Sequence, residues 1–297
     1  MPYIQDIFNF YTIPNLSKEL IPSLTDFFGL IIISLLSFSF IMKSFLINYN
    51  AQYSERFCFG WSFFSIYFFC LNNIFGLNLF ILGFLYSLFL IIIAIFLFKK
   101  NLFFFTYKNL LKNNYELLLI LPIIFILISS NIKEWDSFAF WQPTAVYLTE
   151  NFEFPKSDFW HQKHPYSTVL IYFYSNFLGQ SVLENIPSLF NLIILIFFYL
   201  SLKNYFPNKK LFFLLLLLFI FFNPLLINSK TFTNYADNSL AFILFVIINF
   251  IYRKNFFVEN KKIVIKNLEI LYLFSFVSLL TGIKSSGFIF LRTNSAN

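Results

Sequence analysis

The run LFILGFLYSLFLIIIAIFLF, residues 79 to 98, contains no charged side chain. An α-helix rises about 1.5 Å per residue, so about 20 apolar residues match the ~30 Å hydrocarbon core of a bilayer. We therefore predict a membrane-spanning helix here. Comparable apolar runs lie at 27–42, 57–75, 115–131, 187–202, 211–228, 238–252 and 268–283, and a ninth begins near 285.

The composition of the whole chain supports this assignment. Of the 297 residues, 59% are hydrophobic and only 12% are charged. The predicted fold class is all-α, a polytopic membrane helix bundle of about eight or nine spans. The formal net charge is +7, but the lysines lie in short loops between apolar runs instead of along one face. We therefore expect membrane lipids with anionic headgroups as their partners, and no nucleic acid.

The distribution of charge predicts which loops share a side of the membrane. If the Tyr-rich segment 164–179 lies in the interface instead of spanning, the loops at 43–56, 99–112, 203–210 and 253–266 fall on one side. That side then carries 14 of the 21 lysines and arginines but only four of the 14 acids. Such a bias is typical of cytoplasmic loops. The opposite, external side then holds the N-terminus and the long loop 132–186.

The stretch EWDSFAFWQPTAVYLTEN, residues 134–151, opens this external loop. Asp136 follows the apolar run 115–131 and precedes Ser137, which suits a helix N-cap. We expect a short juxtamembrane helix after Ser137, with the Asp136 carboxylate at the level of a lipid headgroup. An acid favoured by the helix dipole is the alternative explanation for this position.

A second acid, Asp237, lies in TFTNYADNSLAF, residues 231–242, just before another apolar run. The predicted topology brings Asp136 and Asp237 to the same face. Two acids at one cavity suit group transfer, in which one acts as general base and the other orients substrate or holds a divalent cation. Lys284, in LLTGIKSSGFIF at 279–290, is a cation that could face a phosphate, although snorkelling to the interface would also explain it.

The pair His161 and His164, in HQKHPY, has a spacing that raises the question of a metal site. No third ligand is close in sequence, and Pro165 favours an extended entry into a helix from 166. We expect these histidines to contact substrate or headgroups, and the sequence leaves any metal unassigned.

Four of these stretches, in this order, resemble the polyprenyl-phosphate-sugar-dependent glycosyltransferases of the GT-C fold. WDSFAFWQPTAVYLTEN looks like the first external loop of that family, and HPYSTVLIYFYSNFLG (164–179) looks like its HPP-type stretch. NYADNSLAF (234–242) is similar to the YAD-type turn, and LLTGIKSSGFIF to the turn with TK and a later glycine, here Lys284 and Gly287. Tyr166 stands where relatives have a second proline, and Ser286 where they often have an acid.

The resemblance implies an inverting transfer of sugar from a polyprenyl-phosphate donor to a lipid, glycan or protein acceptor at the outer face of the cytoplasmic membrane. No cofactor is implied beyond a divalent cation. It implies Asp136 and Asp237 as catalytic acids. The substrate-binding residues implied are Trp135, Trp141, His161, His164, Tyr166, Tyr235 and Lys284.

The resemblance covers about 115–291 and divides the chain into two predicted regions. Residues 1–113 would form an N-terminal three-span region packed laterally, and 114–297 the glycosyltransferase core. Relatives continue through further spans, so we expect this core to be incomplete. A secondary transporter or lipid flippase is the alternative, with the external acids as substrate or ion sites, although it would predict polar groups near the bilayer midplane.

Overall fold

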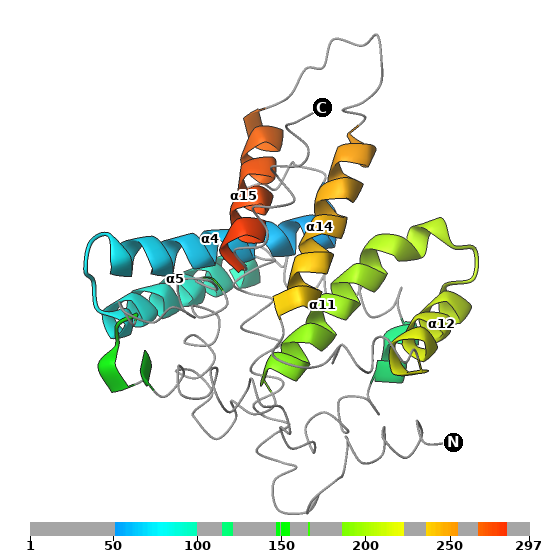
Figure 1. Ribbon diagram of the computed structural model, residues 1–297, viewed down its shortest axis with the longest axis horizontal. Helices are drawn as coiled ribbons and strands as arrows, with labels where there is room; N and C mark the ends of the chain where they lie inside the picture. The colour runs from blue at the N-terminus through cyan, green and yellow to red at the C-terminus, as the bar shows by residue number, and fades with distance from the viewer. Residues whose placement is uncertain are drawn as a thin grey trace, which may run out of the picture.

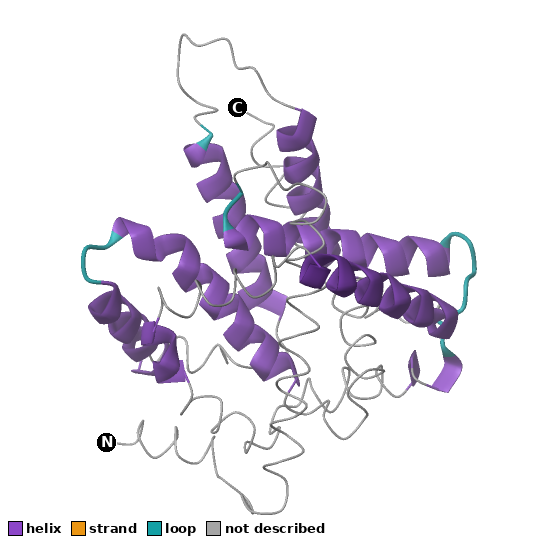
Figure 2. Cartoon of the chain, turned by 180° about the vertical axis from the view of Figure 1, so that it is seen from behind, coloured by secondary structure: helices purple, strands orange, loops and turns teal. Residues whose placement is uncertain are grey.

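The computed structural model describes residues 51–99, 115–120, 147, 148, 150–154, 166, 186–222, 236–254 and 267–283. Every regular element in this part of the chain is a helix (Figures 1 and 2), which confirms the all-α prediction. The elements are α4 (Tyr53–Asn73), α5 (Leu79–Lys99), the 3-10 helix η2 (Tyr115–Ile120), α11 (Ile186–Leu202), the 3-10 helix η5 (Lys203–Tyr205), α12 (Lys209–Phe222), α14 (Ala236–Arg253) and α15 (Asn267–Ile283).

Six of the predicted apolar runs correspond to α4, α5, α11, α12, α14 and α15. The run at 115–131 differs, because its first six residues form the 3-10 helix η2 instead of an α-helix. The runs at 27–42 and near 285 lie outside the described residues. When only the described residues are searched, no helix combines the length and the apolar content needed to cross a membrane.

Helix α4 lies at the centre of the packing and contacts α5, α11, α14 and α15. The side chains of Phe57, Trp61, Phe64 and Phe68 recur at helical spacing and are almost fully buried. On one side Phe57 stacks on a ring of α11, with centroids 4.4 Å apart. The two predicted regions therefore share one core in the described part of the chain, and the boundary at residue 113 itself lies outside it.

A short turn at 74–78 joins α4 to α5, which packs back along α4 (Figure 1). Gly76 has a φ of +65°, a left-handed conformation that glycine adopts without steric cost. The side chain of Asn78 then accepts a hydrogen bond of 2.8 Å from the backbone N–H of Phe80. Tyr86 faces α4 and is buried, whereas the other side of α5 is exposed and wholly apolar at Phe80, Ile81, Phe84, Leu85, Leu88, Ile91, Ile92 and Ile95.

Helices α14 and α15 stand side by side and run antiparallel (Figure 1). At the end of α14 the Phe250 ring stacks on Tyr272, near the start of α15, with centroids 6.0 Å apart. The first residues of α14 consequently lie toward the last residues of α15. This pairing matters because the two helices begin and end next to two of the predicted motif stretches.

Candidate functional site

Two of the nine predicted site residues fall within the described part of the chain. Tyr166 is described with its side chain, and Asp237 is the second residue of α14. A first-turn position suits a carboxylate because the helix dipole stabilises negative charge there. The other seven lie outside the described residues and stay predictions: Trp135, Asp136, Trp141, His161, His164, Tyr235 and Lys284.

Tyr166, from the HPYS stretch, is buried against the last turns of α15. Its hydroxyl shares a hydrogen bond of 3.0 Å with the Ser278 hydroxyl. Its ring lies directly over Gly282, where an added Cβ would come within 2.6 Å of the ring Cγ and closer still to two other ring carbons. The ring also packs edge-on against Phe69 of α4, with centroids 6.0 Å apart. These contacts give Tyr166 a packing role, and direct binding of substrate by it stays a prediction.

The end of the predicted juxtamembrane helix also docks on α4. Residues 147, 148, 150 and 151 are helical, and the helix ends at Phe152, which has a φ of +55°. The Phe152 carbonyl accepts a 2.8 Å hydrogen bond from the backbone N–H of Leu79. Two residues later, the backbone N–H of Phe154 donates to the side-chain oxygen of Asn72 over 3.2 Å. The segment 151–154 is therefore fixed to the turn between α4 and α5.

Asn72 is the polar anchor of this docking. It is buried, and its amide nitrogen also donates to the Leu77 carbonyl over 2.7 Å. We expect Asn72→Ala to lower the free energy of unfolding by about 1–3 kcal/mol, because the buried N–H of Phe154 loses its acceptor and the Leu77 carbonyl loses its donor. The adjacent Asn73 is exposed, and within the described part of the chain its side chain bonds only to the Phe69 carbonyl of its own helix, so Asn73→Ala is the matched control. Thermal unfolding of both variants checks this, and equal loss in the two would contradict it.

A continuous line of contacts runs from Phe154, three residues past the first motif stretch, to residues of two others. Phe154 packs on Phe69 with centroids 6.3 Å apart, Phe69 on Tyr166, and Tyr166 on Gly282. The fourth stretch contains Asp237, at the end of α14 that lies toward the end of α15. Sequence reasoning missed Phe69 and Asn72. The only available signal was the Asn72–Asn73 pair at the end of an apolar run.

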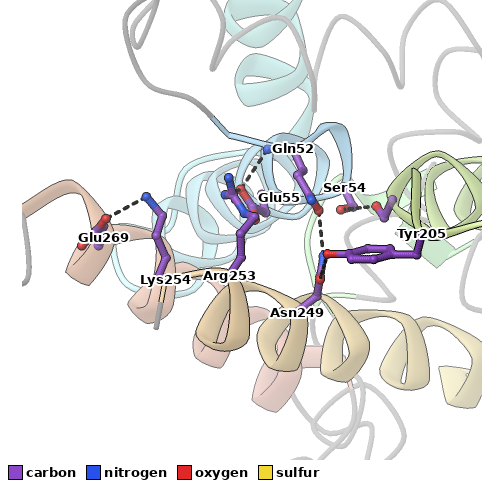
Figure 3. Close-up of polar contacts among 9 residues, drawn as sticks. Gln52, Ser54, Glu55, Tyr205, Asn249, Arg253, Lys254 and Glu269 are labelled. Carbon is purple, nitrogen blue, oxygen red and sulfur yellow. Dashed lines mark hydrogen bonds and ion pairs between the residues drawn. The ribbon is translucent and has the colours of Figure 1, made fainter. Parts of the chain in front are cut away.

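A second polar cluster lies at the opposite end of α14 (Figure 3). Glu55 of α4 is completely buried and both its oxygens bind the Arg253 guanidinium, at 2.7 and 2.5 Å. Glu55 also accepts a 2.9 Å hydrogen bond from the backbone N–H of Gln52, which caps α4. The pattern Q-x-x-E at 52–55 is a variant of the capping box and could have indicated this helix start. Glu55 was not among the predicted site residues.

Further contacts bind the neighbouring helices to this cluster. The Asn249 amide donates to the Gln52 side chain over 2.7 Å, and the Ser54 and Ser201 hydroxyls are 2.5 Å apart. Lys254 pairs with Glu269 at 2.7 Å, which joins the end of α14 to the start of α15. These contacts hold the start of α4 and the ends of α11 and α14 together. The charged side chains of this cluster are paired with one another, which indicates that the cluster has a structural role.

The acid near the start of η2 is also partnered. Glu116 is buried and accepts a short hydrogen bond from the Tyr199 hydroxyl. Beside it, the Lys210 ammonium lies 4.7 Å from the centre of the Tyr115 ring. Burial lowers the pKa of Lys203, Lys209 lowers it further by charge repulsion, and Glu116 opposes both effects. Contacts on either side of the 203–210 turn thus tie it to η2.

Within the described ranges, no group of three or more His, Cys, Asp or Glu side chains is arranged to hold a metal ion. The pair His161 and His164 lies outside those ranges, and the predicted divalent cation stays a prediction. No family model, curated protein or solved structure matches the chain.

Proposed function

We propose that the chain is the core of a membrane glycosyltransferase that moves a sugar from a polyprenyl-phosphate donor to an acceptor at the outer face of the cytoplasmic membrane. The order of the four motif stretches suggests this function. The observation that supports it most is the contact line from Phe154 through Tyr166 to Gly282, which joins the flanks of three stretches. The described start of the fourth, at Asp237, lies toward the same end of α15.

In this proposal Asp136 is the general base. Its carboxylate takes the proton of the acceptor hydroxyl while the acceptor oxygen bonds to the anomeric carbon and inverts it. The bond from that carbon to the phosphate oxygen breaks, and the polyprenyl phosphate leaves. Lys284 stabilises the negative charge that develops on the leaving phosphate. Asp237 orients the substrate or holds a divalent cation, and Trp135, Trp141, Tyr235 and the two histidines bind the sugar and headgroup.

The membrane location rests on composition and on the surface of α5. Eight large apolar side chains on one side of this helix are between 42% and 65% exposed. Monomeric soluble proteins rarely leave a contiguous apolar surface of this kind uncovered. Lipid hydrocarbon is the cover that we propose. The loops rich in lysine would then face the cytoplasm.

An assay with the purified chain tests the proposed function. The protein is incubated in detergent or liposomes with a radiolabelled polyprenyl-phosphate sugar and a mixed lipid extract as acceptor. We expect label to move into an acceptor fraction, and we expect no transfer from the corresponding nucleotide sugar. Transfer from the nucleotide sugar alone would overturn the donor class. No transfer from either donor would remove the glycosyltransferase proposal for this chain.

The alternative of a transporter or flippase is favoured by one observation in α4. Ser62 and Ser65 lie in the middle of this helix, are fully buried and have no hydrogen-bond partner among the described residues. Buried polar groups at mid-helix are a feature of substrate pathways through a membrane. Translocation of a fluorescent polyprenyl phosphate across liposomes, without sugar transfer, would support this alternative.

A further inference from the structure

Tyr166 connects two motif stretches that lie more than a hundred residues apart. It is the third residue of the HPYS segment, directly after Pro165, and it is helical and buried. Its hydroxyl reaches Ser278 and its ring covers Gly282, the second-last residue of α15. A third side of the ring contacts Phe69 of α4. One side chain is thus held by two helices in three directions.

The contact with Gly282 requires a residue without a side chain. Any Cβ at this position would overlap the Tyr166 ring. Glycine inside a helix costs about 0.5–1 kcal/mol relative to alanine, so its presence here calls for a packing reason. The ring of Tyr166 supplies that reason. Tyrosine at 166, where the resembling family has proline, is matched to a glycine that accommodates it.

We propose that Tyr166 is a positioning residue, whose ring on Gly282 and hydroxyl on Ser278 fix the start of the 164–179 segment against the end of α15. The inference rests on the proposed function, because its consequence is for donor binding. In the sequence His164 precedes Tyr166 by two residues, and Lys284 follows Gly282 by two. The junction therefore sets the relative position of the two chain segments that carry these groups, without Tyr166 touching the donor.

The test uses four variants of the full chain. Gly282→Ala introduces the overlapping Cβ, Tyr166→Ala removes the ring, and the double variant Tyr166→Ala with Gly282→Ala removes the overlap. Ser278→Ala removes the hydrogen bond. The matched control is Ser275→Ala, one turn earlier on α15. Among the described residues, the Ser275 hydroxyl bonds only to the Leu271 carbonyl of its own helix, over 2.7 Å.

Donor KM, kcat and the thermal midpoint are measured for each variant. We expect Gly282→Ala and Tyr166→Ala each to raise donor KM about tenfold, since small displacements of binding groups have large effects. In the Tyr166→Ala background, adding Gly282→Ala should change KM by less than about twofold, because the overlap is gone. Ser278→Ala should raise KM by a smaller factor, and Ser275→Ala should leave it unchanged.

Several outcomes would contradict the proposed positioning role of Tyr166. If Gly282→Ala and Tyr166→Ala lower only the midpoint or the amount of active enzyme, with KM unchanged, Tyr166 is merely structural. Equal KM effects in Ser275→Ala would also overturn the inference. If the wild-type chain binds polyprenyl phosphate but transfers no sugar, the proposed function fails and the same comparison is made on Kd. If the wild-type chain does not bind polyprenyl phosphate, the inference fails together with the donor class.

Discussion

Asp136→Asn is expected to lower kcat for sugar transfer by about 100- to 10,000-fold, the range that a general base contributes. Asparagine has nearly the same shape and still accepts a hydrogen bond, but it cannot take the proton of the acceptor hydroxyl. Donor KM should change little, because the base acts on the acceptor. The measurement is single-turnover transfer of a radiolabelled donor by the wild-type and variant chains.

Asp237→Asn tests whether the second acid has a different role from Asp136. If Asp237 orients the donor or holds a cation, the loss should appear in donor KM as well as in kcat. Glu153→Gln is the matched control, because Glu153 is an exposed acid in the predicted external loop that contains Asp136 and has no predicted role. Turnover equal to wild type in both aspartate variants would exclude the two acids from the mechanism. A loss of the same size in Glu153→Gln would show that removing any one negative charge lowers activity, and that Asp237 has no specific role.

The apolar runs predicted the positions of the helices well, because unbroken apolar segments between polar loops mark helix ends clearly. They did not predict which helices touch. Helix α5 is apolar on every face, so its sequence has no contrast that would separate the side facing α4 from the exposed side. The central place of α4 was missed for the same reason, since Phe57 and Trp61 do not differ in type from the exposed Phe63 of the same helix.

The contacts within the candidate site could not be predicted from the sequence either. The sequence indicated Tyr166 as a motif residue, but nothing near it identified Gly282 or Phe69 as its neighbours. Contacts between residues so far apart in the chain depend on how the helices pack, and a single sequence has no signal for them. Local features were easier to predict from the sequence. The first-turn position of Asp237 and the helical residues near 147–151 agree with the short-range patterns.

The count of charges predicted that several loop ends share one side. In the structure three of the described ends meet, because Glu55 near the start of α4 pairs with Arg253 at the end of α14, and Ser54 bonds to Ser201 near the end of α11. That these ends share one side of a membrane stays a prediction. Of the four acids predicted on that side, Glu55, Glu116 and Glu269 are all buried and partnered. These three acids therefore stabilise the fold, and Asp136 and Asp237 stay the acids that we propose for the chemistry.

Glu55→Ala is expected to lower the free energy of unfolding by about 3–5 kcal/mol, the usual loss when one partner of a buried ion pair is removed. The Arg253 side chain is 24% exposed, which favours the lower part of this range. The substitution leaves the guanidinium without its carboxylate and takes the capping acceptor from the Gln52 N–H. Thermal unfolding and titration with a denaturing detergent measure the loss.

Two further variants decide whether the ion pair is the cause. Glu55→Gln keeps the shape and an oxygen for the Gln52 N–H, so it should lose less than Glu55→Ala. The double variant Glu55→Leu with Arg253→Met removes both charges and should recover most of the stability, because no buried charge is left alone. A double variant as unstable as Glu55→Ala would contradict this explanation. Since the pair lies at the end of α14 remote from Asp237, the folded fraction of Glu55→Ala should keep the donor KM of the wild type.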